Sequence, residues 1–275
     1  MTEPTQRKCI FSLTGGRTGT KFLSHLIGEN TDSISIHESL RAVDFGTRTP
    51  DIRTMRLFNE TGFNSEIKSF WRLKFSLIPK TRNFCETNHT LAKCGLIEHI
   101  MSSEKLQNET VIISLSRSDK VRHAISHLKR GDFQKKTIDW QWYLSAQYKN
   151  LIVDPKPFLK YGRPGYIYWY IEEISARQAY YKKIYGQYIK FVDASLEQIS
   201  KAEGARALLS ELGIGELKTI PPAVNQSPQG SFVDVEDQMT EIFKKTRGLA
   251  DNALYQYLNE NKRLHIDKAN NTHLP

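Results

Sequence analysis

The chain has 275 residues, of which 39% are hydrophobic, so it is long enough to bury a substantial core. Its 39 Lys and Arg residues outnumber its 30 Asp and Glu residues, and the formal net charge is +9 at pH 7. This excess favours anionic partners, but net charge alone does not distinguish a nucleotide, a nucleic acid, a sulfated sugar and a membrane surface.

Five short apolar runs predict β-strands. Most of them are apolar at consecutive positions, which is typical of parallel strands buried on both faces. They lie at residues 8–13, 33–37, 82–86, 110–116 and 188–193.

Helices are expected between these strands, at residues 20–29, 91–101, 120–130 and 196–212. The alternation predicts an α/β fold with a doubly wound, mainly parallel five-stranded sheet flanked by helices. In such a sheet the ligand binds beyond the carboxyl ends of the strands.

Two stretches depart from the alternation, and we expect both to be helical. Residues 134–187 form a predicted insertion or lid before the last strand, with helices over 137–150 and 166–187. Residues 231–263 predict a final helix after a turn-rich segment. We expect a single domain over 1–275.

The first strand is followed by TGGRTGTK, residues 14–21. A glycine-bearing turn between a strand and a helix gathers backbone N–H groups and a helix N-terminus at one point, which attracts phosphate or sulfate. Arg17 adds a planar cation suited to a tetrahedral oxyanion. This segment therefore predicts an anion site.

The loop differs from that of ATP-binding proteins, which has the pattern G-x-x-x-x-G-K-[ST]. Gly15 and Gly19 are one residue too close for that pattern, and Phe22 follows Lys21 where a hydroxyl residue would bind Mg²⁺. The anion cradle is kept, whereas the metal-binding hydroxyl is absent.

The stretch TGGRTGTKFLSHL resembles the 5′-phosphosulfate loop of the sulfotransferases that use 3′-phosphoadenosine 5′-phosphosulfate (PAPS). The family pattern is Gly-x-Arg/Lys-Ser/Thr-Gly-Ser/Thr before an apolar helix. The resemblance implies PAPS as co-substrate, with no metal required. It implies nucleotide contacts from Gly15, Gly16, Arg17, Thr18, Gly19, Thr20 and Lys21.

A second resemblance lies in VIISLSRSDKVRHAISHLKR, which follows the fourth strand. In the family, an Arg at the strand end and a Ser in the next helix hold the 3′-phosphate, which implies Arg117 and Ser126 here. Their spacing is nine residues where the family usually has eight. Either the turn holds one extra residue, or Ser118 or Arg122 shares the role.

The segment IKFVDASLEQISKAEGARALLSELGI resembles the late strand and helix of the same family. Its acidic residue, Asp193, has a second interpretation, because P-loop ATPases hold Mg²⁺ with a carboxylate at a strand end. A P-loop kinase or ATPase is therefore one alternative function.

Sulfuryl transfer needs a base for the acceptor, an in-line attack and stabilisation of the leaving oxygen. Arg17 and Lys21 are expected to supply positive charge. For the base, the resemblance places a Glu or His at the end of the second strand, where Glu38 is the first candidate and His37 the second. Glu38 could instead pair with Arg41.

Other polar residues have simpler interpretations. His37 could be a core histidine. Glu86 ends the third strand and could line the acceptor site, and His89 is close by, but positioning or structural roles are favoured for both. His123 and His127 are four residues apart on a helix and lack a third metal ligand, so we expect them on the surface.

One face of the predicted helix over 166–187 is apolar and aromatic, interrupted by Gln178. Such a stripe is typical of a core-facing helix, although an aromatic wall for a sugar or phenolic acceptor is a second interpretation. Its members are Ile167, Tyr170, Ile171, Ile174, Tyr181 and Tyr185.

Three cysteines cannot all pair with one another, and no Cys/His spacing typical of a metal site occurs. The first residues lack a signal-peptide pattern, and no run of about eighteen apolar residues occurs. We therefore expect reduced thiols and a cytoplasmic enzyme without a membrane span.

The leading hypothesis is a PAPS-dependent sulfotransferase that acts on a hydroxyl or amine of a small-molecule, lipid or glycan acceptor. Besides the ATPase, the other alternative is a non-enzymatic binder of polyanions or nucleic acid, suggested by the sequence pI of 9.3. The sequence contains no recognised nucleic-acid motif to support this alternative. In addition, aromatic residues do not alternate with the basic residues at 117–136.

Overall fold

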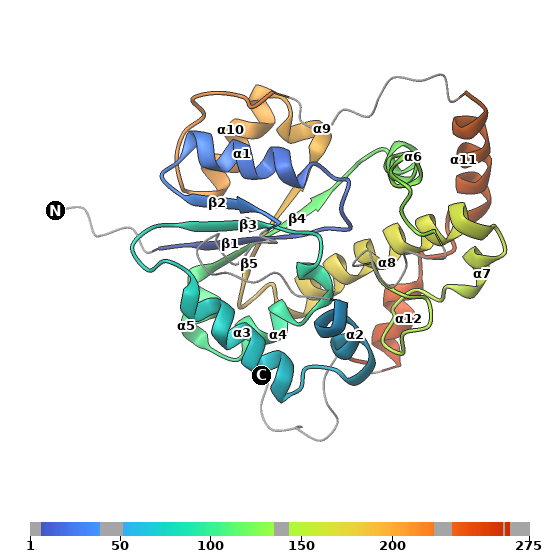
Figure 1. The fold of residues 1–275 in the computed structure, drawn as a ribbon, viewed down its shortest axis with the longest axis horizontal. Helices are drawn as coiled ribbons and strands as arrows, with labels where there is room; N and C mark the ends of the chain where they lie inside the picture. Colours follow the sequence, from blue (N-terminus) through green and yellow to red (C-terminus); the bar gives the residue numbers. More distant parts are fainter. Residues whose placement is uncertain (1–6, 39–51, 135–142, 223–232, 261, 265–275) are drawn as a thin grey trace.

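The computed structural model describes residues 7–38, 52–134, 143–222, 233–260 and 262–264. In this part of the chain five strands form one parallel sheet, in the order β2-β3-β1-β4-β5 (Figure 1). They are β1 (Cys9–Leu13), β2 (Ile34–His37), β3 (Phe84–Thr87), β4 (Thr110–Ser116) and β5 (Lys190–Ser195). The predicted α/β fold class is confirmed.

The central strand β1 is covered on both faces. All five of its residues are buried, and successive side chains reach opposite faces of the sheet. Ile10 belongs to a core cluster that includes Leu23 and Leu209, whereas Phe11 belongs to a second cluster that includes Trp71. The continuous apolar run of β1 follows from this double burial.

Helices form a layer on each face and a group beyond the strand ends (Figure 1). One face is covered by α1 (Thr20–Asn30), α9 (Leu196–Ile199) and α10 (Ala202–Leu212). The other face carries α2 (Ile52–Thr61), α3 (Ser65–Leu77), α4 (Leu96–Met101), α5 (Glu104–Glu109) and α8 (Gly162–Tyr185). The remaining helices are α6 (Lys120–Arg130), α7 (Lys156–Leu159), α11 (Val233–Thr246) and α12 (Ala253–Asn259).

The predicted helices at 20–29 and 120–130 are confirmed by α1 and α6. The one predicted over 91–101 is divided at Gly95, whose φ of 84° ends a short 3₁₀ helix, η1 (Leu91–Lys93), before α4 begins. The one predicted over 196–212 is likewise two helices. Helix α9 begins with a capping box between Ser195 and Gln198.

The sequence-based expectations lack α2, α3 and α5. In α3 the buried positions are Ile67, Trp71 and Lys74, so a charged residue interrupts the apolar face. Lys74 is fully buried because its ammonium pairs with the Glu86 carboxylate at 2.6 Å. A hydrophobic pattern alone does not reveal such a helix, because the pairing residue lies on β3.

The helix expected over 166–187 is confirmed by α8, and the six residues of its apolar face are buried in the core. The helix expected over 137–150 is wrong for residues 143–150, which contain no helix. There the Tyr166 hydroxyl accepts a bond from Ala146 N and donates one to Leu144 O, so backbone groups pair with a side chain instead. Residues 137–142 lie outside the described residues.

The final helix expected over 231–263 is two helices, α11 and α12, since the chain turns at Gly248 with a φ of 85°. Positions 231, 232 and 261 of that prediction lie outside the described residues. Across the described ranges, no helix combines the length and the apolar character needed to cross a membrane.

Candidate functional site: an anion cradle beside a carboxylate and histidine cluster

The carboxyl ends of β1 and β4 lie side by side, with Leu13 in register with Ser114. The chain passes from β1 to β2 and β3 on one side of the sheet and then to β4 and β5 on the other. The strand order therefore reverses between β1 and β4, which is where doubly wound sheets bind ligands. The loop at 14–19 and the start of α6 meet at this point.

The carbonyl groups of the first loop are held from behind by side chains of α6 and α8. Three such bonds are Gln178 Nε2 to Leu13 O (2.6 Å), Tyr170 OH to Gly15 O (2.9 Å) and His123 Nε2 to Gly16 O (2.8 Å). These bonds hold Leu13, at the end of β1, and Gly15 and Gly16 of the loop by their carbonyl groups.

The N–H groups of the loop have few partners in the protein. Helix α1 begins after Gly19, which is left-handed (φ 85°, ψ 27°) and provides no side-chain cap. Over the described ranges, no protein acceptor pairs with the backbone N–H groups of Arg17, Thr18 or Gly19. An uncapped helix start with such donors is suited to a phosphate or sulfate group.

The side chains of the loop divide into two groups. The Thr18 hydroxyl bonds the Thr14 hydroxyl at 2.5 Å, and both Thr18 and Thr20 are buried. Arg17 instead reaches α6, where its Nε donates to Ser126 Oγ at 3.1 Å. The structure thus places the loop after β1 next to helix α6. The sequence motifs linked these two elements to opposite ends of one nucleotide.

Arg117 lies near the same point. The charges of both Arg117 and Arg17 act on His123, the residue that holds Gly16. The Nε of Arg117 lies 3.4 Å from Glu197 Oε1, and Ser118 N donates to the other carboxylate oxygen of Glu197 at 2.9 Å. Arg122 is largely exposed and pairs with Asp119.

The expected surface position of His123 and His127 is wrong, because both are buried. His127 Nδ1 donates to Asp132 Oδ2 at 2.9 Å, and Tyr143 OH donates to the same oxygen. Burial lowers the pKa of both imidazoles, and that of His123 falls well below its usual value. His123 supports the loop through its bond to Gly16 O, and His127 packs beside it. No group of three or more metal-ligand side chains occurs among the residues that the structure describes.

A carboxylate and histidine cluster lies at the adjacent ends of β2 and β3. Glu38 N continues the sheet by donating to Thr87 O at 3.2 Å, and Glu38 has a positive φ of 45°. His37 donates through Nδ1 to Thr87 O at 3.0 Å, which leaves its Nε2 3.9 Å from Glu38 Oε2. His89 Nδ1 lies 3.6 Å from Glu38 Oε1. Arg41, the other partner considered for Glu38, lies outside the described residues.

His89 joins this cluster to the anion loop. A Cβ added at Gly16 would lie 3.3 Å from His89 Cβ, so the ring packs directly against the loop. Both ring nitrogens are buried without a hydrogen-bond partner, and burial lowers the His89 pKa well below its usual value. In the sequence, the signal for this residue is its position just after the third strand.

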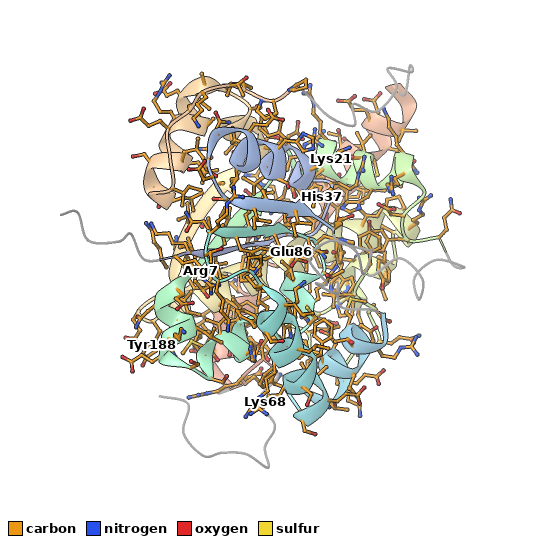
Figure 2. The ribbon with its side chains drawn as sticks, turned by 60° about the vertical axis from the view of Figure 1, so that its left-hand side comes forward. Arg7, Lys21, His37, Lys68, Glu86 and Tyr188 are labelled. Atoms are coloured by element: carbon orange, nitrogen blue, oxygen red, sulfur yellow. The ribbon has the colours of Figure 1, made fainter. Side chains whose placement is uncertain are left out.

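Lys21 faces the same cluster from α1. Burial lowers the pKa of His37, Glu38 opposes that shift, and the charge of Lys21 adds to it. Figure 2 places Lys21 and His37 at one end of the sheet and Arg7 at the other. Glu86 is fully buried and pairs with Lys74, so the structure favours a structural role for this residue.

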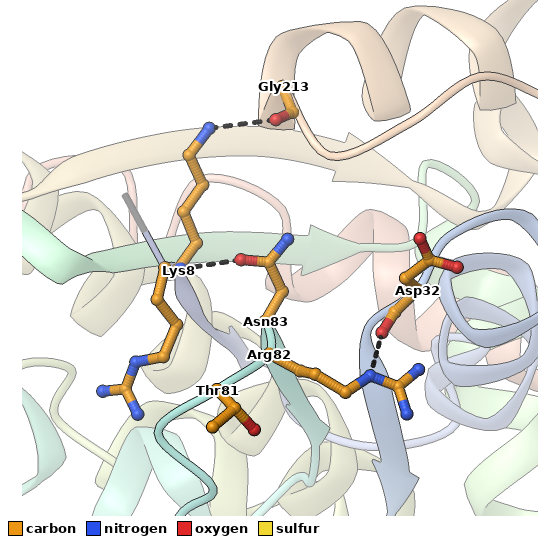
Figure 3. Close-up of a pocket in the computed structure, with 7 residues that line it drawn as sticks. Lys8, Asp32, Thr81, Arg82, Asn83 and Gly213 are labelled. Atoms are coloured by element: carbon orange, nitrogen blue, oxygen red, sulfur yellow. Dashed lines mark hydrogen bonds between the residues drawn. The ribbon is translucent and has the colours of Figure 1, made fainter. Parts of the chain in front are cut away.

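A second basic region lies at the amino ends of the strands, where Figure 3 shows a pocket. Its cations are engaged with the protein. Lys8 Nζ donates to Leu212 O and Gly213 O, and Arg82 Nε donates to Asp32 O. Arg7 pairs with Glu109 at 2.8 Å.

The geometry disfavours the ATPase alternative. Asp193 lies within β5, where its side chain is 65% exposed and pairs with Lys182 at 2.6 Å. Phe22 is buried in the core at the position where an ATP loop has its metal-binding hydroxyl. The chain therefore lacks the loop hydroxyl of that class, and its candidate carboxylate is paired with Lys182.

No protein-family model matches the chain, and no curated protein matches its sequence. Among solved structures, the chain is similar to a sulfotransferase from Alicyclobacillus acidocaldarius, with 14% sequence identity and a TM-score of 0.44. The match covers 90% of this chain and 96% of that one. Function is therefore inferred from the site itself.

Proposed function

We propose that this protein is a sulfotransferase that moves the sulfuryl group of PAPS to a hydroxyl or amine of an acceptor. The observation that carries the proposal is the bond from Arg17 Nε to Ser126 Oγ at 3.1 Å. It joins the uncapped loop after β1 to the basic helix after β4. A nucleotide with a 5′-phosphosulfate and a 3′-phosphate has two anionic groups, and these adjacent elements offer N–H, hydroxyl and cationic donors to both.

The 5′-phosphosulfate binds at the N–H groups of residues 17–19 and the start of α1. Gly15, Gly16 and Gly19 form the backbone of this cradle, while Arg17 and Lys21 supply positive charge. The 3′-phosphate binds at Ser126 and Arg117, where Glu197 holds the guanidinium in place. Phosphate groups favour such forked cations and hydroxyl donors.

In the transfer, the acceptor oxygen forms a bond to sulfur while the bond from sulfur to the 5′-phosphate oxygen breaks. The leaving product is adenosine 3′,5′-bisphosphate, whose new charge is stabilised by Arg17 and the loop N–H groups. A sulfuryl group carries less charge than a phosphoryl group, so cations of the protein are sufficient.

Glu38 accepts the proton that the acceptor loses. Its carboxylate lies between His37 and His89, and the latter packs on the loop that holds the sulfuryl donor. The positive φ of Glu38 holds its side chain at a strand end, which is typical of functional positions. His37 is the second candidate base. The acceptor itself is a small molecule, a lipid or a glycan precursor.

The proposal is tested by thermal shift with three ligands. Adenosine 3′,5′-bisphosphate, in the presence of a chelator, should stabilise the protein, because a ligand that binds the folded state raises the midpoint. Stabilisation by Mg·ATP alone would support the kinase or ATPase instead. Stabilisation by heparin or DNA alone would support a polyanion binder.

A second experiment identifies the reaction directly. The protein is incubated with PAPS labelled in its sulfuryl group and with pools of phenols, sterols, lipids and oligosaccharides. Transfer of label to an acceptor that depends on Glu38 would support the proposal. If the bisphosphate binds but no pool accepts label, the nucleotide site stands and the transferase activity does not.

A further inference from the structure

A buried lysine lies one hydrogen bond behind the anion loop. Lys93 ends η1, is fully buried, and donates from Nζ to Tyr170 OH at 2.8 Å. The Tyr170 hydroxyl donates in turn to Gly15 O at 2.9 Å. The sequence did not single out Lys93, and it placed Tyr170 on an aromatic stripe interpreted as core-facing or as an acceptor wall.

The packing around this chain of bonds is tight. A Cβ at Gly15 would lie 3.3 Å from Tyr170 Cε1, so the tyrosine ring supports the loop directly. The rings of Tyr143 and Tyr170 lie 5.3 Å and 5.2 Å from Lys93 Nζ, a distance at which an aromatic face attracts a cation. The ammonium is thereby held in a site with little water.

Charged and titratable groups surround Lys93 on several elements. Burial lowers its pKa to about 7, Arg177 of α8 adds to that effect, and Cys94 and Glu38 oppose it. The charge of Lys93 in turn lowers the pKa of two histidines, His89 after β3 and His127 on α6. Tyr170 of α8 and Tyr143 also contribute to this environment.

The two protonation states of Lys93 differ in their effect on the loop. An ammonium has only donors, so it directs the Tyr170 hydroxyl proton toward Gly15 O. A neutral amine can accept that proton, which leaves Gly15 O without a fixed donor. Orientation of the loop N–H groups therefore depends on the charge of Lys93.

We infer that Lys93 is a positioning residue that takes up a proton from solvent when the anionic nucleotide binds, and that Tyr170 transmits its charge to the loop. A nearby anion favours the charged form of a lysine, and the charged lysine favours the loop conformation that binds the anion. This inference rests on the proposed function, because it requires an anion in the loop.

The test is calorimetric titration of adenosine 3′,5′-bisphosphate in buffers of different ionisation enthalpy. For the wild-type protein near pH 7.5 we expect uptake of about three quarters of a proton that is attributable to Lys93, because a group with a pKa near 7 is then mostly neutral before binding. The Lys93→Met variant should lack that component. The difference between the two proteins removes protons bound by the nucleotide itself.

The Tyr170→Phe variant keeps the ring and removes only the hydroxyl. It should bind the nucleotide about 5-fold more weakly, the effect of one lost hydrogen bond, and its proton uptake should also change. This variant decides the question if Lys93→Met does not fold.

Equal proton uptake in wild type and folded Lys93→Met would overturn the inference. So would a Tyr170→Phe protein with wild-type affinity and wild-type uptake. A wild-type protein that does not bind the bisphosphate would instead remove the proposed function, so the two failures are distinguishable.

Discussion

Basic residues lie at both ends of the parallel strands, here called the amino edge and the carboxyl edge of the sheet. The partners of the polar groups differ between the two edges. At the amino edge, Lys8 and Arg82 donate to backbone carbonyls and Arg7 pairs with Glu109. At the carboxyl edge, the N–H groups of the loop at 17–19 have no acceptor in the described protein. Both ring nitrogens of His89 are also unpartnered and buried.

Local charge alone therefore does not locate a binding site in this protein. A cation that is already bonded to the protein contributes to stability, whereas buried polar groups without partners carry a free-energy cost that a ligand can relieve. The carboxyl edge retains this cost at His89 and lies where the strand order reverses, whereas the unpartnered side-chain groups described at the amino edge are the hydroxyls of Ser33 and Thr110. A ligand of opposite charge is therefore expected there and not in the pocket of Figure 3.

The largest expected effect comes from Glu38→Gln. The amide cannot accept the acceptor's proton, so turnover should fall at least about 100-fold, the usual contribution of a general base. Affinity for adenosine 3′,5′-bisphosphate should remain nearly unchanged, because Glu38 lies beside the cradle and not in it. Steady-state kinetics and calorimetry measure the two quantities, and a fully active variant would rule out this base.

Arg17→Ala tests the cradle against the amino edge. Loss of a charged donor should weaken bisphosphate binding about 30-fold, or about 2 kcal/mol. Arg117→Ala should act in the same direction but less strongly, because Glu197 already pairs with that guanidinium.

Arg82→Ala is the matched control, since it removes a guanidinium from the amino edge. Its calorimetric affinity should equal that of the wild type. Equal losses in Arg17→Ala and Arg82→Ala would mean that the nucleotide responds only to overall charge, and the contrast between the two edges would disappear.

The strands and the anion loop at the carboxyl edge could be predicted from the sequence, because strand patterns and the loop motif are local signals. The strands, α1 and α6 follow from them, and the loop and Ser126, which the motifs linked to one nucleotide, are close together in the structure. The supporting contacts were not readable. His123 holds Gly16 across 107 positions, and nothing near either residue indicates that contact.

The same reason explains the role of α8. Its aromatic face indicated a core helix, and the six residues are buried as expected. That Tyr170 and Gln178 of this helix also bond the loop depends on how α8 crosses the strand ends. Such crossings are set by packing of distant elements, for which a single sequence contains no pattern.

The smallest expected effect compares two glycines, one at each edge. Gly19 and Gly213 both have positive φ, 85° and 62°, so alanine at either position should destabilise the fold by about 1 kcal/mol. A Cβ at Gly19 would lie 2.4 Å from Leu196 Cδ1, whereas at Gly213 it would lie 2.9 Å from the flexible end of Lys8. Thermal melts should therefore show a lower melting temperature for both variants, with a slightly larger decrease for Gly19→Ala.

Only Gly19→Ala should also weaken bisphosphate binding, by a few-fold, because it displaces the N–H groups at the start of α1. Equal binding by the two variants would show that the start of α1 is a structural turn and that the anion binds elsewhere.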